Sequence, residues 1–290
     1  MCSRRRDVSP NRHSWRLAAL GMMCAIPCYA GAATARTTVS TDLVALVAPD
    51  GIVLTTSLLR HWDLADGDSV LLRGRYFETG ISVAANPAAV TGGLFAEWVP
   101  VAPLQLRVGY DAYGFLGCNG ALLRFPSSTS RFGKAEIDAA AGSETAGLGH
   151  RLLFTPTLRG ELGSLLLQSQ TDLAWYALSN REGWYYEMEY DTLLAKRDFL
   201  VSNRTTLLGE LWRGGGEASW RIGPGYEVTY AGRAHIARER VEGVLFWSPT
   251  DRWGAIRRPR LLAIGGVDLI DRNRQGEPFA LMSLGADVDF

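Results

Sequence analysis

Apolar and polar side chains alternate with a period of two along most of the chain. The clearest example is 104–115, where Val108 and Tyr110 share an apolar face while Arg107 and Asp111 lie on the other. Because successive side chains of a strand point to opposite faces, each such segment is predicted to be a two-faced strand. Strands are predicted at 69–79, 91–99, 104–115, 151–161, 164–178, 184–194, 200–212, 217–222, 226–236, 240–248, 260–270 and 279–290.

Two all-β architectures fit this pattern. A soluble sandwich buries the apolar faces, whereas a closed antiparallel up-and-down transmembrane barrel turns them to lipid and turns the polar faces to its lumen. The predicted strands have lengths near the 9–11 residues that cross a bilayer when tilted, aromatic residues gather at their ends, and charges lie within them. These features favour a barrel of about 12 strands, with 14 or 10 strands as alternatives.

The alternative of 14 strands comes from the N-terminal segment 33–68. This segment contains two apolar stretches, 42–48 and 51–59, that lack a clear polar face. It is interpreted either as two further strands or as a periplasmic or lumen-filling segment that precedes a barrel at 69–290.

Residues 1–32 carry the features of a cleaved secretory signal. Five arginines and one aspartate precede a short apolar stretch that ends in small residues, Ala30-Gly31-Ala32. The apolar stretch is too short for a spanning helix, which needs roughly 20 residues. Export is therefore predicted. Cys118 is the only cysteine after the signal, so an internal disulfide is excluded.

The last strand ends in an aromatic residue. Its apolar face is formed by Phe290, Val288, Ala286, Leu284 and Met282. A terminal aromatic on such a strand resembles the C-terminal insertion signal of Gram-negative outer-membrane β-barrel proteins. The resemblance implies a location in the outer membrane, surrounded by lipid and lipopolysaccharide, and insertion by the barrel assembly machinery. The strand count without a passenger domain also resembles solitary autotransporter-like barrels, which implies no catalytic residue.

The polar faces of the strands are rich in charge of both signs. In a wide barrel such residues would set ion selectivity, and in a narrow one they would pair across the lumen. A barrel of about 12 strands lies between these cases, so a partly occluded lumen with a narrow conduit is expected. The residues predicted to face the lumen are Arg107, Asp111, Arg159, Glu161, Glu187, Glu189, Asp191, Arg204, Glu210, Arg221, Glu227 and Arg233, with Arg240 and Glu242 continuing the series.

Connections between the predicted strands fall into two groups. Short segments at 99–103, 160–164, 195–199 and 223–225 are predicted to be periplasmic turns. The long stretch 116–147, rich in Gly, Ser and Ala, is predicted to be an external loop with a functional or mobile character.

Candidate chemistry is sparse, and a non-enzymatic structural or narrow-pore role is favoured. His61, His150 and His235 lie far apart in the sequence, so no metal site or cofactor is predicted, and no nucleic-acid surface is evident. His235 is expected to be a hydrogen-bonded lumen residue. A lipid or lipopolysaccharide hydrolase remains an alternative, with His150 as base beside a loop that contains Ser127, Ser128, Ser130, Ser143 and Glu144. An exported β-sandwich that binds a ligand is the third hypothesis.

Overall fold

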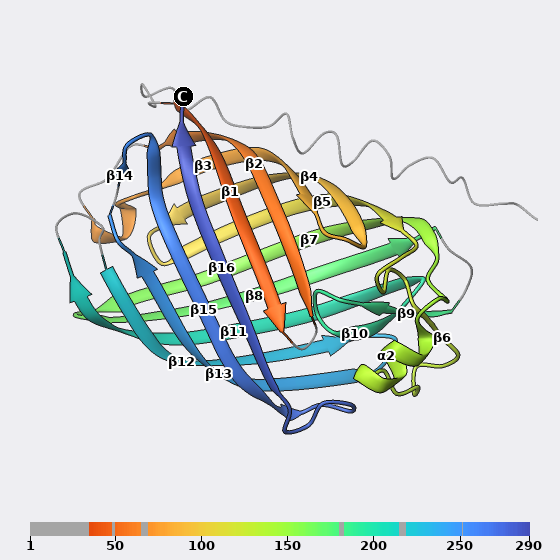
Figure 1. Cartoon of the computed structure of the whole chain (residues 1–290). Coiled ribbons are helices and arrows are strands. Elements are labelled where there is room, and N and C mark those ends of the chain that lie inside the picture. The colour runs from red at the N-terminus through yellow and green to blue at the C-terminus, as the bar shows by residue number, and fades with distance from the viewer. Residues whose placement is uncertain (1–34, 48–49, 65–68, 180–182, 215–218, 251) are drawn as a thin grey trace, which may run out of the picture. The chain divides into compact units, whose positions relative to one another are not determined.

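A computed structural model describes residues 35–47, 50–64, 69–179, 183–214, 219–250 and 252–290. The predicted signal at 1–32 lies outside these residues. The described chain forms a closed antiparallel barrel of 12 strands (Figure 1). Its strands are β1 (Ala35–Val47), β2 (Gly51–Asp63), β3 (Tyr76–Ala85), β4 (Ala89–Val101), β5 (Leu104–Leu116), β7 (Ala146–Leu162), β8 (Leu165–Leu178), β11 (Arg197–Arg213), β12 (Ser219–Ala231), β13 (Ile236–Ser248), β15 (Ile256–Ile270) and β16 (Pro278–Asp289).

Each strand pairs with the strand next to it around the ring, and β1 pairs with β16 to close it. Two short elements lie near one end of the ring, the 3-10 turn η1 (Val70–Leu72) before β3 and the strand β14 (Arg252–Trp253), which pairs with β15. Closure satisfies the backbone hydrogen bonds of every strand edge without water. No helix in the described part of the chain has the length and apolar composition needed to span a membrane.

The outer surface of the barrel is apolar on every strand. A soluble sandwich would bury such side chains, so the apolar exterior contradicts that alternative and fits a transmembrane barrel. The exposed residues include Leu43, Leu58, Ile81, Leu94, Val108, Leu152, Leu167, Leu207, Ile222, Val241, Val267 and Leu284, one from each strand.

The two ends of the barrel differ. The end that carries Phe290 also has the short turns at 102–103 and 163–164, and we call it the termini end. The opposite end carries the long connections 117–145 and 179–196 together with the turns 232–235 and 271–277, and we call it the plug end.

The expected number of strands is confirmed, and the N-terminal segment supplies two of them, β1 and β2, which was one of its two interpretations. Three of the strand assignments within 69–290 were wrong. The segment 69–79 begins with η1, and the strand at this place is β3, at 76–85. The segments 217–222 and 226–236 are parts of one strand, β12, which continues through Gly223-Pro224-Gly225. The segment 184–194 is not a barrel strand, because it forms a hairpin within a separate three-stranded sheet.

Two of the four predicted periplasmic turns were also wrong. The segment 223–225 lies in the middle of β12, and 195–199 lies at the plug end, where Leu178 N donates to Lys196 O over 2.8 Å. The turns within 99–103 and 160–164 lie together at the termini end. The long loop 116–147 is also folded, because it contains the strand β6 (Arg124–Phe125) and the helix α2 (Lys134–Ala140).

Candidate functional site: a plugged lumen

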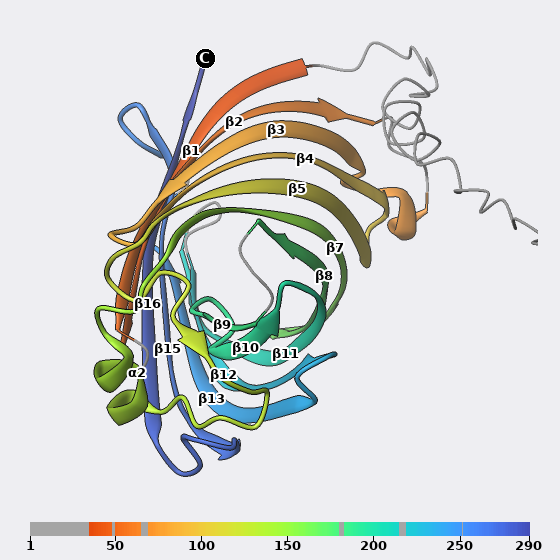
Figure 2. The same ribbon diagram turned by 90° about the vertical axis from the view of Figure 1, so that its right-hand side faces the viewer.

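A small sheet fills part of the barrel interior. It consists of β6, β9 (Trp184–Glu187) and β10 (Thr192–Ala195), in the order β10-β9-β6. Figure 2 shows these strands inside the ring of barrel strands. We call the two segments that supply them, 117–145 and 183–196, the plug.

The plug is held by an apolar core within the barrel. Its own contribution includes Phe132, Leu193 and Leu194, which are almost fully buried. They pack with small and apolar residues that the barrel wall turns inward at this level, namely Ala174, Leu200, Ala231 and Ile236. Burial of an apolar side chain of this size stabilises a fold by about 1.5–3 kcal/mol. The aromatic and apolar pattern of 184–194 therefore reflects burial against protein.

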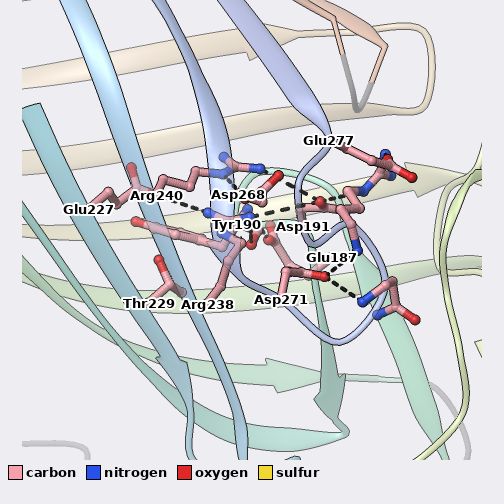
Figure 3. Close-up of polar contacts among 12 residues, drawn as sticks. Glu187, Tyr190, Asp191, Glu227, Thr229, Arg238, Arg240, Asp268, Asp271 and Glu277 are labelled. Atoms are coloured by element: carbon pink, nitrogen blue, oxygen red, sulfur yellow. Dashed lines mark hydrogen bonds and ion pairs between the residues drawn. The ribbon is translucent and has the colours of Figure 1, made fainter.

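A buried carboxylate fixes the tip of the β9–β10 hairpin (Figure 3). Asp191 is 2% exposed and adopts a φ of 47°. Its carboxylate accepts a hydrogen bond from the Tyr186 hydroxyl over 2.5 Å and forms an ion pair with Arg274 at 2.8 Å. Arg240 and Arg238 of β13 lie 3.8 and 3.9 Å from the same carboxylate. The hairpin tip thus supplies the negative charge that these buried arginines need.

The barrel wall beside the hairpin carries its own network of charges. Arg238 donates to the backbone oxygen of Tyr190 over 2.6 Å and to Glu227 over 2.7 Å. Arg240 donates to Asp268 over 2.6 Å. Arg204 pairs with Glu227 and, at 3.0 Å, with Glu242.

A second anchor joins the plug to the other side of the lumen. Arg151 of β7 pairs with Asp111 of β5 at 2.8 Å and with Glu189 of the hairpin at 2.5 Å. Its guanidinium lies 5.5 Å from the ring centre of Tyr113 and 5.9 Å from that of Tyr176. Cation–π contacts at these distances add to the ion pairs.

A cavity of about 910 Å³ remains in the lumen beside the plug. Its lining extends from Asp50 and Asn86 at the plug end to Gln105 and Gln168, which lie close to the termini end. The hydroxyl of Tyr113 and the side-chain oxygen of Gln105 line it and have no hydrogen-bond partner among the described residues. Both atoms are buried polar groups without a partner in the described part of the chain, which is uncommon in folded proteins.

The residues predicted to face the lumen lie in four parts of the structure: the cavity, the termini end, the plug and the turn after β12. Those lining the cavity are Arg107, Asp111, Glu187, Glu189, Arg204 and Glu227. Near the termini end, Arg221 pairs with Glu161 at 3.4 Å and with Glu210 at 3.9 Å, and Arg159 lies on the same stretch of β7 as Glu161. Asp191 is buried in the plug, and Arg233 is exposed in the turn after β12.

Several members of the network were missed in the sequence. Arg238 alternates with Arg240 and Glu242 in β13, so the period-two pattern contained the signal for it. Arg274 lies in the turn 271–277, and no local pattern distinguishes it from a surface residue. Its partner Asp191 is distant in sequence, so only the folded chain brings them together.

The histidines lie apart from one another. His61 faces the lumen between Asp63 at 2.9 Å and Glu78 at 3.2 Å. His150 and His235 are exposed, and their Nδ1 atoms lie 2.6 and 2.9 Å from the hydroxyls of Tyr110 and Tyr230. The expected lumen position of His235 was therefore wrong, because it lies in the turn before β13 with a φ of 51°.

The loop serines form local hydrogen bonds. Ser127 bonds with Thr129 over 2.7 Å, and Ser143 donates to Ala140 O over 2.6 Å. The ring nitrogen contact of His150 is to a tyrosine, so the structure brings no serine nucleophile and histidine base together at this position. The described residues contain no group of His, Cys, Asp and Glu side chains suited to a metal ion.

Comparison with known proteins finds likeness in structure. No protein-family model matches the sequence, and no curated protein matches it. Among solved structures, the β domain of the Bordetella autotransporter BrkA is 12% identical, over 88% of this chain and 98% of that one, with a TM-score of 0.42. The translocator domain of the autotransporter NalP from Neisseria meningitidis is 12% identical, over 88% of both chains, with a TM-score of 0.40.

A KdgM porin in complex with disordered oligogalacturonate is 8% identical, over 87% of this chain and 99% of that one, with a TM-score of 0.38. These likenesses concern the fold alone. The closed ring of strands and its apolar exterior are the features of an integral membrane barrel. The chain therefore has the fold of a closed, membrane-spanning type of β-barrel.

Proposed function

We propose that this protein is a non-enzymatic, narrow pore whose lumen is held partly shut by the plug. The observation that carries the proposal is the cavity of about 910 Å³, which extends between residues near both ends of the barrel. The plug packs against β8, β11, β12 and β13, and the cavity beside it is lined by residues of every barrel strand except β15. Undocking of the hairpin would widen this cavity into a larger channel.

The lining of the cavity favours small polar solutes that are neutral or cationic. Hydroxyl and amide groups line much of it, including those of Ser57, Ser82 and Gln168. Its acidic residues, Asp50, Glu97, Asp111, Asp172, Glu187, Glu189 and Glu227, outnumber its arginines, Arg107, Arg151, Arg204, Arg238 and Arg240. An excess of carboxylates disfavours the entry of anions.

The orientation of the barrel is part of the proposal. The two-residue turns 102–103 and 163–164 lie at the termini end, and such short turns are typical of the periplasmic side of outer-membrane barrels, whereas the two longest connections lie at the plug end. We therefore place the plug end outside the cell. The plug would then meet solutes before the rest of the lumen does.

The experiment is excision of the hairpin followed by conductance recording in planar bilayers. Ala177 and Arg197 are paired, and Leu178 N donates to Lys196 O over 2.8 Å, so Asn-Gly in place of residues 179–195 joins β8 to β11 by a two-residue turn. The expected result is a small cation-selective conductance for the intact chain and a severalfold larger one for the excised chain. A matched excision of residues 252–255, in the connection between β13 and β15 at the termini end, tests whether the shortening of a connection has this effect by itself.

Two results would contradict the proposal. The first is that the excised chain, shown to be folded by its heat-dependent migration on a gel, conducts no better than the intact chain. The second is a preference for anions in both proteins, which would show that the excess of carboxylates does not control passage.

A further inference from the structure

Four basic side chains gather on the outer surface at the plug end. His150 lies on β7, Arg197 on β11, and Arg233 and His235 lie in the turn between β12 and β13; all four are exposed. We call them the basic rim. His150 and Arg197 both pair with Ala177 of β8, so they flank that residue on its two sides. Arg233 N donates to the Asp198 carboxylate over 2.9 Å, which brings the turn beside Arg197.

The two arginines of the basic rim have no counter-ion among the described residues. Asp198, which follows Arg197 in the sequence and accepts a hydrogen bond from Arg233 N, is 6% exposed. Its oxygens accept backbone hydrogen bonds from Ala195 at 2.9 Å, Phe199 at 2.8 Å and Arg233 at 2.9 Å. This carboxylate is therefore occupied by the backbone. The lumen arginines Arg151, Arg204, Arg238 and Arg240, in contrast, are each paired with carboxylates.

The two histidines of the basic rim can each offer a hydrogen-bond donor, the Nε2–H group, to a ligand outside the barrel. Each Nδ1 lies within hydrogen-bond distance of a tyrosine hydroxyl, Tyr110 for His150 and Tyr230 for His235. When the phenol donates to Nδ1, a neutral imidazole carries its proton on Nε2. Each ring then offers an N–H donor, and protonation adds a positive charge without removing that donor.

The basic rim lies at the edge of an aromatic band. Tyr110, Trp175, Phe199 and Tyr230 are between 37% and 47% exposed on the outward face. Phe199 is two residues from Arg197 along β11, or about 7 Å at the rise of an extended strand. Aromatic residues of membrane barrels mark the boundary between hydrocarbon and headgroups. The basic rim is thus placed at the depth of the headgroups.

We propose that the basic rim binds the phosphate groups of a phosphorylated glycolipid in the outer leaflet. Guanidinium groups bind phosphate oxygens through paired N–H donors, and the imidazole Nε2–H groups add further donors. The exposed aromatic and aliphatic side chains below the rim provide a surface for the acyl chains. The leaflet follows from the proposed orientation, in which the plug end is external, whereas phosphate recognition depends only on the basic rim.

The test measures lipid binding to the folded barrel in detergent. Bisphosphorylated lipid A is titrated into purified protein and counted by native mass spectrometry, with lipid A that lacks both phosphates as the reference. The double variant Arg197→Ala/Arg233→Ala should bind the phosphorylated lipid about tenfold or more weakly. Arg197→Lys/Arg233→Lys should retain an intermediate affinity, because it keeps the charge and loses the paired donors.

The matched control is Arg252→Ala, which removes an exposed arginine at the termini end. It should bind the phosphorylated lipid as the unmodified protein does. Heat-dependent gel migration establishes that every variant is folded. Equal affinity for the two lipids, or an equal loss of affinity in the control and the double variant, would overturn the proposal. The assay needs no bilayer and measures no conductance, so its failure would leave the proposed pore untouched.

Discussion

Ser57 and Leu58 are neighbours in β2, yet their side chains meet different surroundings. Ser57 lines the cavity, whereas Leu58 is 45% exposed on the outer surface. The period-two pattern determines which side chains share a face, and it predicted opposite faces directly for Arg107 and Val108 of β5. The pattern was less clear in β2, because two neighbouring residues of the same polarity lie on opposite faces. Thr55 faces the cavity and Thr56 faces outward.

The first prediction uses this pair of neighbours. Leu58→Arg should lower the free energy of unfolding by about 2–4 kcal/mol, because a charge near the middle of a strand must enter hydrocarbon. Ser57→Arg should have a much smaller effect, since the cavity already contains charged groups. Urea unfolding in lipid vesicles, followed by tryptophan fluorescence, measures both. Equal losses would show that the outer face of β2 does not meet lipid.

The second prediction concerns Glu187 in the plug. Burial, and then the neighbouring Glu189, raise its pKa from 4.5 to about 7, while Arg151 and the Tyr190 N–H at 2.7 Å oppose the rise. Tyr176 of β8 also faces this carboxyl. A raised pKa means that the docked hairpin keeps a proton that an undocked, solvated hairpin would release. Docking should therefore be strongest below about pH 4.5 and weaken as the pH rises to about 7.

Hydrogen exchange of the hairpin amides measures this dependence. After correction for intrinsic exchange, opening should be at least tenfold more frequent at pH 8 than at pH 5. Glu187→Gln should remove most of the difference, because an amide does not titrate. A pH dependence that persists in this variant would assign the effect to another group.

At the scale of elements, the pattern predicts strands well and their surroundings poorly. An apolar face looks the same in sequence whether it meets lipid or protein, so the hairpin at 184–194 resembled a barrel strand. In β12, Pro224 lacks an N–H, and the bridges to β11 are interrupted between Thr206–Gly225 and Gly209–Ile222. A side chain at Gly223 would collide with Leu207 O. A glycine that indicated a turn in sequence instead permits close packing of two strands.

The third prediction addresses the attachment of the hairpin. Asp191→Asn removes the charge that pairs with Arg274 at 2.8 Å and lies close to Arg238 and Arg240. Loss of one partner from a buried ion pair costs about 3–5 kcal/mol, because the remaining charge is left uncompensated. The expected result is frequent undocking of the hairpin and a larger conductance in an otherwise intact barrel.

Asp50→Asn is the control for this prediction. Asp50 lies at the same end of the barrel, and its ion pair with Lys134 at 3.4 Å is exposed. Exposed pairs contribute about 0–1 kcal/mol, so the hairpin should remain docked in this variant. The interpretation of Asp191 as an anchor fails if the two variants conduct alike.

The whole molecule depends on one seam, where the first and last barrel strands meet. β16 pairs with β1 from Thr38–Asp289 to Val47–Ala280, and with β15 on its other side. The C-terminal strand was fully evident in the sequence, because its apolar face is unbroken and ends in an aromatic residue. Its partner β1 was not, since the inward face of β1 changes from Ser40 and Asp42 to Val44 and Leu46 along its length. The barrel therefore closes between β16, which the sequence predicted clearly, and β1, which it did not.

The last prediction tests whether the C-terminal strand also directs insertion. Leu284 is 47% exposed on the outer face, and Phe290 is 81% exposed at the end of the chain. Deletion of Phe290, or Leu284→Asp, should leave the protein in the periplasm, because the apolar face that the assembly machinery would read is interrupted. The control is Ser283→Asp, which changes the adjacent position on the lumen side of β16 and leaves that face intact. Fractionation of the cell envelope with heat-dependent gel migration measures insertion. If Leu284→Asp and Ser283→Asp reach the outer membrane equally, the apolar face of β16 carries no insertion signal, and closure of the barrel must depend on other strands.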